Sequence, residues 1–305
     1  MPELPDITVY VEKLNERLVS QPLERIRFVS SFLLRSVDPS ISSVPGKTIR
    51  SVSRLGKRIV FELDDDLFLV LHLMISGRLR WRPRNDKVPR KTGLAAFDFP
   101  NGTLLLTEAS PKKRASLVLV AGKQALASIN RGGLEVMEAT LRSFRAAIQR
   151  ENHTLKRSLT DPRIFSGIGN AYSDEILHRA RLSPVKLSKR LTDDEVKRLY
   201  HSCRGTLQYW TDALRKEAGD GFPEKVTAFR DSMAVHGKFG QPCPVCGTAV
   251  QRIRYADNET NSCPTCQTGG KLLADRGLSR LLRADWPKSL VDLEEMKNVR
   301  TTDPA

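Results

Sequence analysis

The sequence lacks features that mark several classes of protein. No apolar run reaches the length of about 18 residues that a membrane-spanning helix requires. The N-terminus, MPELPDITVY, has neither the basic region nor the apolar region of a secretory signal. Internal repeats and low-complexity tracts are also missing. These absences predict a cytoplasmic protein that is not attached to a membrane.

Cysteines are few, and this limits the kind of protein further. Only five occur in 305 residues, and a chain without a secretory signal is expected where thiols stay reduced. A secreted domain held together by disulfides is therefore excluded. Cys203 stands alone in a stretch with a helical pattern and is expected to be a small core residue.

Acidic residues are too few to balance the basic ones. Lys and Arg number 50 against 35 Asp and Glu, so the net charge is +15 and the pI is about 9.8. This surplus predicts a polyanionic partner, either nucleic acid or an acidic membrane surface. With 305 residues, 40% of them hydrophobic, the chain is long enough for two folded domains.

Four of the cysteines have a spacing typical of a metal site. They form two pairs, Cys243-x2-Cys246 and Cys263-x2-Cys266, separated by sixteen residues. Two residues between thiols allow one tight turn to direct both sulfurs at one ion, and the gap is long enough for a β-hairpin. The pattern predicts one structural Zn²⁺ with four thiolate ligands and no open position for catalysis.

The first part of the chain has the pattern of a β-sandwich covered by a helix. Residues 5–19 are amphipathic, and their apolar face consists of Ile7, Val11, Leu14 and Leu18. From about 23 to 120 the pattern is that of strands, with apolar alternation on both sides of an acidic turn at 64–66. Asn101-Gly102 marks a tight hairpin.

The later part has a helical pattern. It begins after Arg131-Gly132-Gly133 and continues to about residue 217. Thr192-x-x-Glu195 is a capping box that begins a long helix. The zinc hairpin follows, and 39 residues lie beyond Cys266, where Leu278, Leu281 and Leu282 predict one more amphipathic helix.

The N-terminus carries a group suited to nucleophilic catalysis. If Met1 is removed, the chain begins with the secondary amine of Pro2, followed directly by the carboxylate of Glu3. An α-amine titrates near pH 7.7–8.0, so roughly 10–20% of it is neutral at pH 7, against less than about 0.1% of a lysine. Such an amine can attack a carbonyl or a sugar C1′, although Pro at position 2 is also common without this chemistry.

Other segments contain candidate anion-binding residues. Lys57 lies in a basic turn before a strand, and Lys112-Lys113-Arg114 is a second basic cluster; each is either a phosphate contact or a solvated face. Asn170 follows two glycines before a helix expected over 171–181, where it either caps the helix or directs N–H groups at an anion. His72 by itself has the pattern of a structural histidine.

Together these segments resemble the formamidopyrimidine-DNA glycosylase/endonuclease VIII family. The resemblance rests on the opening MPELPD, the RLGKRIV turn, HLMISG at 72–77, GIGNAYSDE at 167–175, and the cysteine hairpin ending in CPTCQ. The segments occur in the order of the family and cover about residues 1–267. This combination is highly specific.

The resemblance implies a multidomain α+β enzyme of base-excision repair. It would consist of a catalytic β-sandwich with a capping helix at 1–133, a helical helix-two-turn-helix domain at 134–235, a four-cysteine zinc finger at 236–275 and a tail at 276–305. Duplex DNA with a damaged base or abasic site would lie in the basic cleft between the domains, and the oxidised base would be flipped out. A nucleoid-associated monomer is implied.

The resemblance also implies roles for individual residues. Pro2 would attack C1′ while Glu3 assists by proton transfer, and the resulting imine would permit β- and then δ-elimination. Lys57 would act with them in the catalytic site. DNA contacts would come from His72, Ile75, Asn170, Glu175 and Asn258, with Glu175 near the flipped base.

The chain departs from the family pattern in several places. Asp6 replaces the usual Glu, and HLMISG places Ile75, or Met74 if the register shifts, where HLGMSG has its Met wedge. A segment from Glu108 to Arg114 replaces DPRRF, so the void left by a flipped base must be filled otherwise. Asn258 stands where the zinc hairpin usually has Arg, which removes a fork of charged donors.

Three hypotheses follow. The first is a bifunctional glycosylase and abasic-site lyase that removes 8-oxoguanine, formamidopyrimidine or oxidised pyrimidines. The second is a protein that binds lesions or DNA structures with weak or no catalysis, because the Arg-Phe wedge of DPRRF and the hairpin Arg are missing. The third is a zinc-ribbon protein that binds RNA or ribosomes, which leaves the N-terminal motif unexplained.

Overall fold

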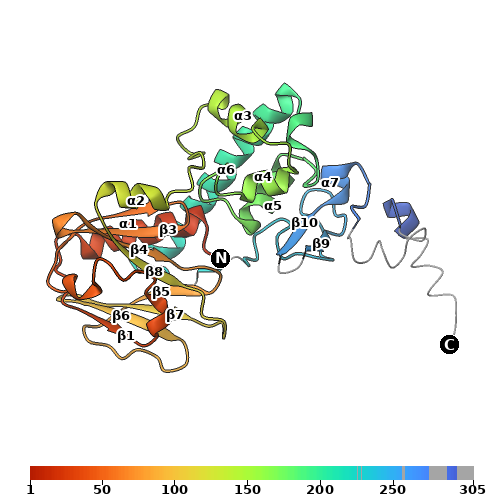
Figure 1. Ribbon diagram of the computed structural model, residues 1–305. Coiled ribbons are helices and arrows are strands. Elements are labelled where there is room, and N and C mark those ends of the chain that lie inside the picture. The colour runs from red at the N-terminus through yellow and green to blue at the C-terminus, as the bar shows by residue number, and fades with distance from the viewer. Residues whose placement is uncertain (225, 228, 256–257, 275–286, 294–305) are drawn as a thin grey trace, which may run out of the picture. The chain divides into compact units, whose positions relative to one another are not determined.

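The computed structural model describes residues 1–224, 226–227, 229–255, 258–274 and 287–293 (Figure 1). The chain divides into two compact units. The first contains Met1–Glu135 and Leu207–Ala228, and the second contains Val136–Thr206 and Phe229–Ala305. Within the described residues, no helix is both long and apolar enough to cross a membrane.

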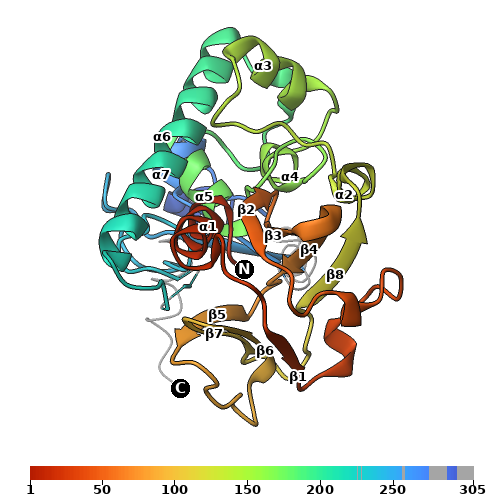
Figure 2. The ribbon, with the colours of Figure 1, turned by 90° about the vertical axis from the view of Figure 1, so that its left-hand side faces the viewer.

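The first unit is built on two four-stranded antiparallel sheets (Figures 1 and 2). One sheet has the order β2-β3-β4-β8 and consists of Ile49–Leu55, Arg58–Leu63, Leu67–His72 and Ser116–Ala121. The other has the order β1-β6-β7-β5 and consists of Arg25–Phe28, Gly93–Phe99, Gly102–Glu108 and Gly77–Arg82. The predicted sandwich is confirmed, and so is the hairpin at Asn101-Gly102, because Phe99 pairs with Gly102.

Three helical features complete the sandwich. Helix α1 (Leu4–Leu18) packs against β2 and buries the predicted apolar residues Ile7, Leu14 and Leu18 completely. Helix α2 (Lys123–Ile129) packs against β8. Single turns of 3₁₀ helix occur at η1 (Ser31–Leu33), η2 (Ile41–Ser43) and η3 (Asp64–Asp66), the last forming the predicted acidic turn.

Strand β4 is buried on both faces, whereas its sequence alternation suggested one buried face. Leu69 and Leu71 point into the core of the sandwich. Phe68 and Val70, on the opposite face, form a second cluster that Leu126 of α2 covers. A strand covered on both sides is held rigidly, and β4 ends at His72, one of the predicted site residues.

The second unit is helical and includes the cysteine hairpin. Its elements are α3 (Leu141–Gln149), α4 (Leu155–Thr160), α5 (Asn170–Arg179), η4 (Ser188–Arg190), β9 (Gln251–Tyr255), β10 (Asn258–Ser262) and α7 (Pro264–Thr268). Helix α6 (Asp193–Ala218) belongs to it as far as Thr206. The predicted capping box is present, since Thr192 N–H donates to Glu195 Oε2 at 2.9 Å and Glu195 N–H to Thr192 Oγ1 at 3.3 Å.

One detail differs from the sequence predictions, and another prediction falls outside the described residues. Asn170 was a candidate cap, but the N-cap of α5 is Gly169, and Asn170 is the first helical residue. The extended backbone of Gly169 (φ −133°) ends the loop one residue earlier than expected. The helix predicted around Leu278 lies outside the described residues. Cys203 is fully buried as expected, and burial raises the pKa of its thiol.

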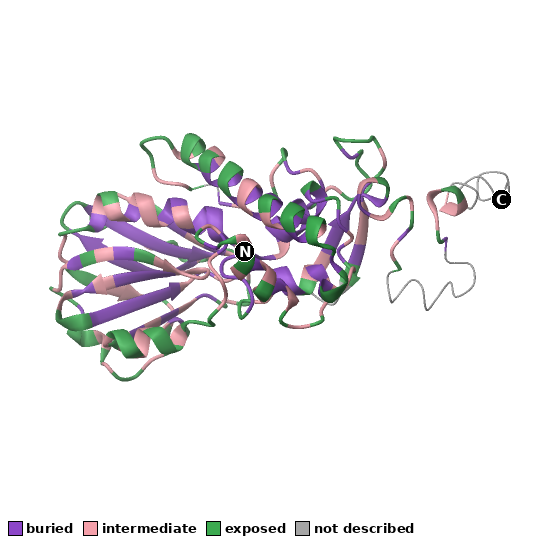
Figure 3. Cartoon of the chain, turned by 90° about the horizontal axis from the view of Figure 1, so that it is seen from above, coloured by how far each residue is buried: buried purple, intermediate pink, exposed green. Residues whose placement is uncertain are grey.

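The extent of burial differs between strands and helices (Figure 3). Strands β4, β6 and β7 are buried along almost their whole length, while α1 and α3 have exposed or partly exposed residues on one side. This pattern agrees with amphipathic helices that cover apolar cores.

Candidate active site and zinc site

The N-terminal residues are held by a reciprocal cap at the start of α1. Glu3 N–H donates to Asp6 Oδ2 at 2.9 Å, and the Glu3 side chain accepts from the backbone N–H of Asp6. Glu3 is 2% exposed and Asp6 is 3% exposed. Asp6 is one methylene shorter than the Glu usual in the family, and it still closes the capping box. The backbone that follows Pro2 is therefore fixed.

The surroundings of the terminal amine lower its pKa. In this chain the amine belongs to Met1, and burial is the main cause that lowers its pKa. Arg78 and Lys57 lower the pKa further, while Glu3 and Asp6 act in the opposite direction. Sequence reasoning missed Arg78, because a basic residue inside a strand has no distinctive local pattern.

Lys57 lies in the tight turn that joins β2 to β3. Leu55 pairs with Arg58 across this turn, and Gly56 adopts the left-handed backbone conformation (φ +63°) that the turn requires. Arg58 pairs with His72 on the next strand. The register therefore brings Lys57 and His72 to the same end of the sheet, where β3 begins and β4 ends.

His72 is a neutral imidazole near pH 7. Burial, with the charges of Arg58 and Lys57, lowers its pKa to about 4. Its Nδ1 lies 2.6 Å from the sulfur of Met74. A neutral ring can donate one N–H to a phosphate oxygen but adds no charge of its own.

The loop after His72 places Ile75 at the surface. Met74 has a left-handed backbone (φ +51°) at the position where the family motif has glycine. Gly77 N–H donates to Leu73 O at 2.9 Å, and a Cβ at Gly77 would collide with that carbonyl. Ile75 is 50% exposed. Ile75 is therefore exposed on this loop, and its role as the wedge stays a prediction.

Glu108 organises the segment that replaces DPRRF. Its carboxylate is 1% exposed and accepts N–H groups of Arg114 at 2.9 Å and Ala115 at 3.0 Å. Lys112 and Arg114 are exposed, and Lys113 Nζ donates to the carbonyl of Glu108. The segment is thus a closed loop with cationic residues at its surface.

In the second unit, Lys156 holds the start of α5. Its Nζ donates to Asn170 O at 2.7 Å and to Asp174 Oδ1 at 2.5 Å. Gly167 has a positive φ of +81°, which directs the loop into the helix. Asn170 itself is half-buried and is the first residue of the helix.

Glu175 has partners within the protein that sequence reasoning did not anticipate. Its carboxylate accepts the backbone N–H groups of Ala234 at 2.8 Å, Val235 at 2.9 Å and His236 at 2.9 Å. Glu175 is 7% exposed. Three N–H donors account for a structural role, holding the loop before the zinc finger, while the predicted contact with DNA stays a prediction.

The four predicted zinc ligands lie together. All four Sγ atoms are within 4.8 Å of one another, with Cys243 and Cys266 3.9 Å apart and Cys246 and Cys263 3.3 Å apart. Tetrahedral Zn–S bonds of about 2.3 Å require sulfurs about 3.8 Å apart. Gly247 has the left-handed conformation (φ +75°) of a knuckle turn. The donor set fits one Zn²⁺, and four protein ligands make the site structural.

The hairpin position that usually carries Arg is only partly described. Asn258 pairs with Tyr255 at the start of β10, and its side chain lies outside the described residues. Arg252 lies over the ring of Phe239 at 4.4 Å and within 3.9 Å of Glu259. The DNA contact of Asn258 stays a prediction.

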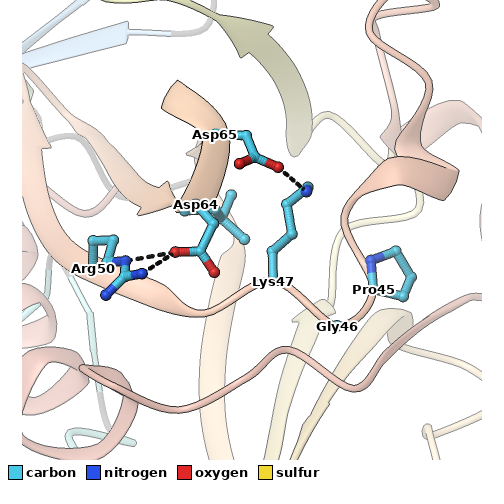
Figure 4. Close-up of a pocket in the computed structure, with 7 residues that line it drawn as sticks. Pro45, Gly46, Lys47, Arg50, Asp64 and Asp65 are labelled. Carbon is cyan, nitrogen blue, oxygen red and sulfur yellow. Dashed lines mark hydrogen bonds and ion pairs between the residues drawn. The ribbon is translucent and has the colours of Figure 1, made fainter.

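A pocket of about 700 Å³ in the first unit is unrelated to these residues. It lies where β2 begins and β3 ends, whereas Lys57 lies at the other end of both strands. Its charged residues pair with one another, Arg50 with Asp64 at 2.5 Å and Lys47 with Asp65 (Figure 4). None of the predicted site residues lines this pocket.

Family models match the chain in three consecutive segments. The formamidopyrimidine-DNA glycosylase N-terminal domain matches residues 1–114, the H2TH domain of the same glycosylases matches 134–219, and the zinc finger found in FPG and IleRS matches 240–269. The third match supports zinc as the metal of the cysteine site.

Whole proteins and solved structures of the same glycosylases are also similar to this chain. The formamidopyrimidine-DNA glycosylase of Heliobacterium modesticaldum is 30% identical over 280 residues, covering 88% of this chain and 100% of that protein. A complex between Lactococcus lactis Fpg and DNA containing an abasic site has a TM-score of 0.78 at 26% identity, covering 87% of this chain and 99% of that one. A complex of a Lactococcus lactis FPG mutant with Fapy-dG DNA has a TM-score of 0.77 at 27% identity, with coverages of 88% and 100%.

These matches run along the whole length of the relatives and follow the order of the motifs. They agree with the sandwich, the helical unit and the cysteine site described above. The chain therefore belongs to the formamidopyrimidine-DNA glycosylase family of base-excision-repair enzymes.

Proposed function

We propose that this enzyme excises oxidised bases and cleaves the resulting abasic site through the amine of Pro2. The observation that carries the proposal is the buried N-terminus, where Asp6 caps Glu3 and where burial, together with Arg78 and Lys57, lowers the pKa of the terminal amine. Removal of Met1 would leave the amine of Pro2 in the same surroundings. Zinc takes no part in the reaction.

The proposed reaction begins at the sugar. The lone pair of the Pro2 nitrogen attacks C1′, the bond from C1′ to the base breaks, and the base leaves with the electron pair and a proton. Glu3 assists by proton transfer at the sugar. The C1′–O4′ bond then breaks as O4′ takes a proton, which leaves an iminium ion between Pro2 and the opened sugar. This iminium is an electron sink, so loss of a 2′ proton expels the 3′ phosphate, and δ-elimination then expels the 5′ phosphate.

The surrounding residues are proposed to hold the DNA. Lys57 supplies a charge, and neutral His72 supplies one N–H donor to a backbone phosphate. Asn170 is the proposed contact of another backbone phosphate. Exposed Ile75 fills part of the void beside the flipped base, with Lys112 and Arg114 presented by the neighbouring loop.

Partner and location follow from the same proposal. A net charge of +15 suits a monomer that binds duplex DNA with damaged bases or abasic sites. We place the protein in the cytoplasm, at the nucleoid.

The test is to trap the imine. Borohydride should link the wild-type protein covalently to duplex DNA containing an abasic site or 8-oxoguanine, and Pro2→Gly should greatly reduce this adduct. Sequencing of the purified protein should show that Met1 has been removed. Equal trapping by the Pro2→Gly variant would reject Pro2 as the nucleophile.

A second candidate is a lesion-binding protein with little catalysis. It is favoured by the absence of the Arg-Phe wedge and of the hairpin Arg. Tight binding of damaged duplex without nicking would support it, and nicking over many turnovers would reject it. A panel of duplexes with oxidised purines and pyrimidines would define the preferred lesion.

A further inference from the structure

One face of helix α5 is directed at the zinc finger and the loop before it. Asp174, Glu175 and His178 share this face, because they are separated by one, three and four positions. Glu175 accepts the loop N–H groups described above. Asp174 Oδ2 lies 2.8 Å from Nδ1 of His236 and 3.4 Å from Nδ2 of Asn261 in β10.

His178 makes the remaining contact of this face, and that contact is with a zinc ligand. Its Nε2 lies 3.2 Å from Sγ of Cys243, 65 positions away in the chain. His178 is 6% exposed and Cys243 is 2% exposed. A metal-bound thiolate has no proton, so the imidazole must be the donor.

Charge explains why such a donor matters. Four thiolates around a divalent ion carry a net charge of −2, and N–H donors to sulfur disperse it. Sγ of Cys263 accepts from the N–H of Cys266 at 3.4 Å, a backbone donor inside the finger. The donor to Cys243 is instead a side chain of a helix outside the finger.

We propose that His178 is a positioning residue of the zinc centre. Its Nε2–H donates to the Cys243 thiolate, orients this ligand and slows the loss of zinc. The bond also ties metal retention to α5, the helix that carries Asn170 at its other end. This proposal rests on the zinc site and is independent of the chemistry at Pro2.

The experiment compares the zinc-loaded full-length protein with three variants. His178→Phe keeps an aromatic ring without a donor, and His178→Gln keeps an N–H donor. His201→Phe is the matched control, because His201 is exposed on α6 and its ring contact is with Tyr200. Zinc release into excess chelator is followed with a metallochromic dye, and circular dichroism establishes that each variant is folded.

We expect His178→Phe to release zinc about 10-fold to 100-fold faster than wild type, with His178→Gln intermediate and His201→Phe unchanged. In Co²⁺-substituted protein, the thiolate-to-cobalt charge-transfer band should move to longer wavelength in His178→Phe and return in His178→Gln. Packing alone does not predict this recovery.

The proposal is overturned if His178→Phe retains zinc as wild type does. It is also overturned if Phe and Gln variants release zinc equally fast with an unshifted cobalt band, because the ring would then act by packing. Should His178→Phe not fold, His178→Leu replaces it as the variant without a donor, and the same comparison with His178→Gln decides.

Discussion

The N-terminal site and the zinc finger owe their geometry to different forces. Glu3 and Lys57 are attached to a sandwich whose core includes side chains from both sheets and from α1. Among the described residues, the finger and the loop before it share a small buried cluster, formed by Val235, Cys243, Val250 and Cys263. The first site is positioned by burial of apolar area, whereas the second depends on metal ligation and on side chains of α5. The two sites should therefore respond differently to amino-acid substitutions.

The largest expected effect is the loss of a zinc ligand. Cys263→Ser should release the metal and unfold the hairpin, because binding energies of about 10–16 kcal/mol are coupled to folding in small zinc modules. Metal content and hydrogen exchange would measure the change, with protection lost in β9 and β10 but retained in β3 and β4. Cys203→Ser is the control, since this thiol is buried away from the cluster. A folded finger without metal would contradict the zinc assignment.

The next effect is chemical and concerns the N-terminal site. Glu3→Gln keeps an acceptor for the Asp6 N–H but cannot transfer a proton, so base release should slow by about 10²–10⁴-fold. Single-turnover assays on a lesion duplex would measure it, with zinc content unchanged. Glu16→Gln, exposed on α1, should behave as wild type. An unchanged rate in Glu3→Gln would remove Glu3 from the mechanism.

A smaller effect is expected from one surface charge. Lys57→Ala should weaken DNA binding irrespective of sequence and make the slope of log affinity against log salt shallower by about one. Titrations at several salt concentrations would measure the slope. Lys13→Ala removes a lysine that is paired with Glu16 on α1 and should leave the slope nearly unchanged. The same slope in both variants would argue against a phosphate contact by Lys57.

The smallest effect is a pH dependence of the free energy of unfolding. Folding lowers the pKa of His72 from 6.5 to about 4, so the unfolded chain binds the extra proton between these values. The contribution of His72 is complete above pH 6.5 and is lost as pH falls towards 4. The urea concentration at the midpoint of unfolding should decrease between pH 7 and pH 5, and this decrease should be smaller in His72→Gln than in wild type. An equal decrease in both proteins would mean that folding does not lower the pKa of His72.

Local sequence patterns predicted the structural features that involve residues close together in the chain. The capping box at Thr192, the hairpin at Asn101-Gly102 and the cysteine knuckles each involve residues only a few positions apart, and the structure contains all three. The prediction for Asn170 was wrong by one position, because the backbone of Gly169 allowed the cap to form earlier. Asp6 showed that a shorter acid serves the same cap.

What the sequence by itself determined was the set of chemical groups: an amine beside a carboxylate, four thiols at ligand spacing, and a basic surplus. Only the tertiary structure decided their surroundings. The second buried face of β4 depends on α2. Burial, with the charge of Arg58 on the paired strand, lowers the pKa of His72. The contact of His178 with Cys243 joins residues 65 positions apart. Burial and long-range hydrogen bonds act between residues tens of positions apart, so no local pattern contains them.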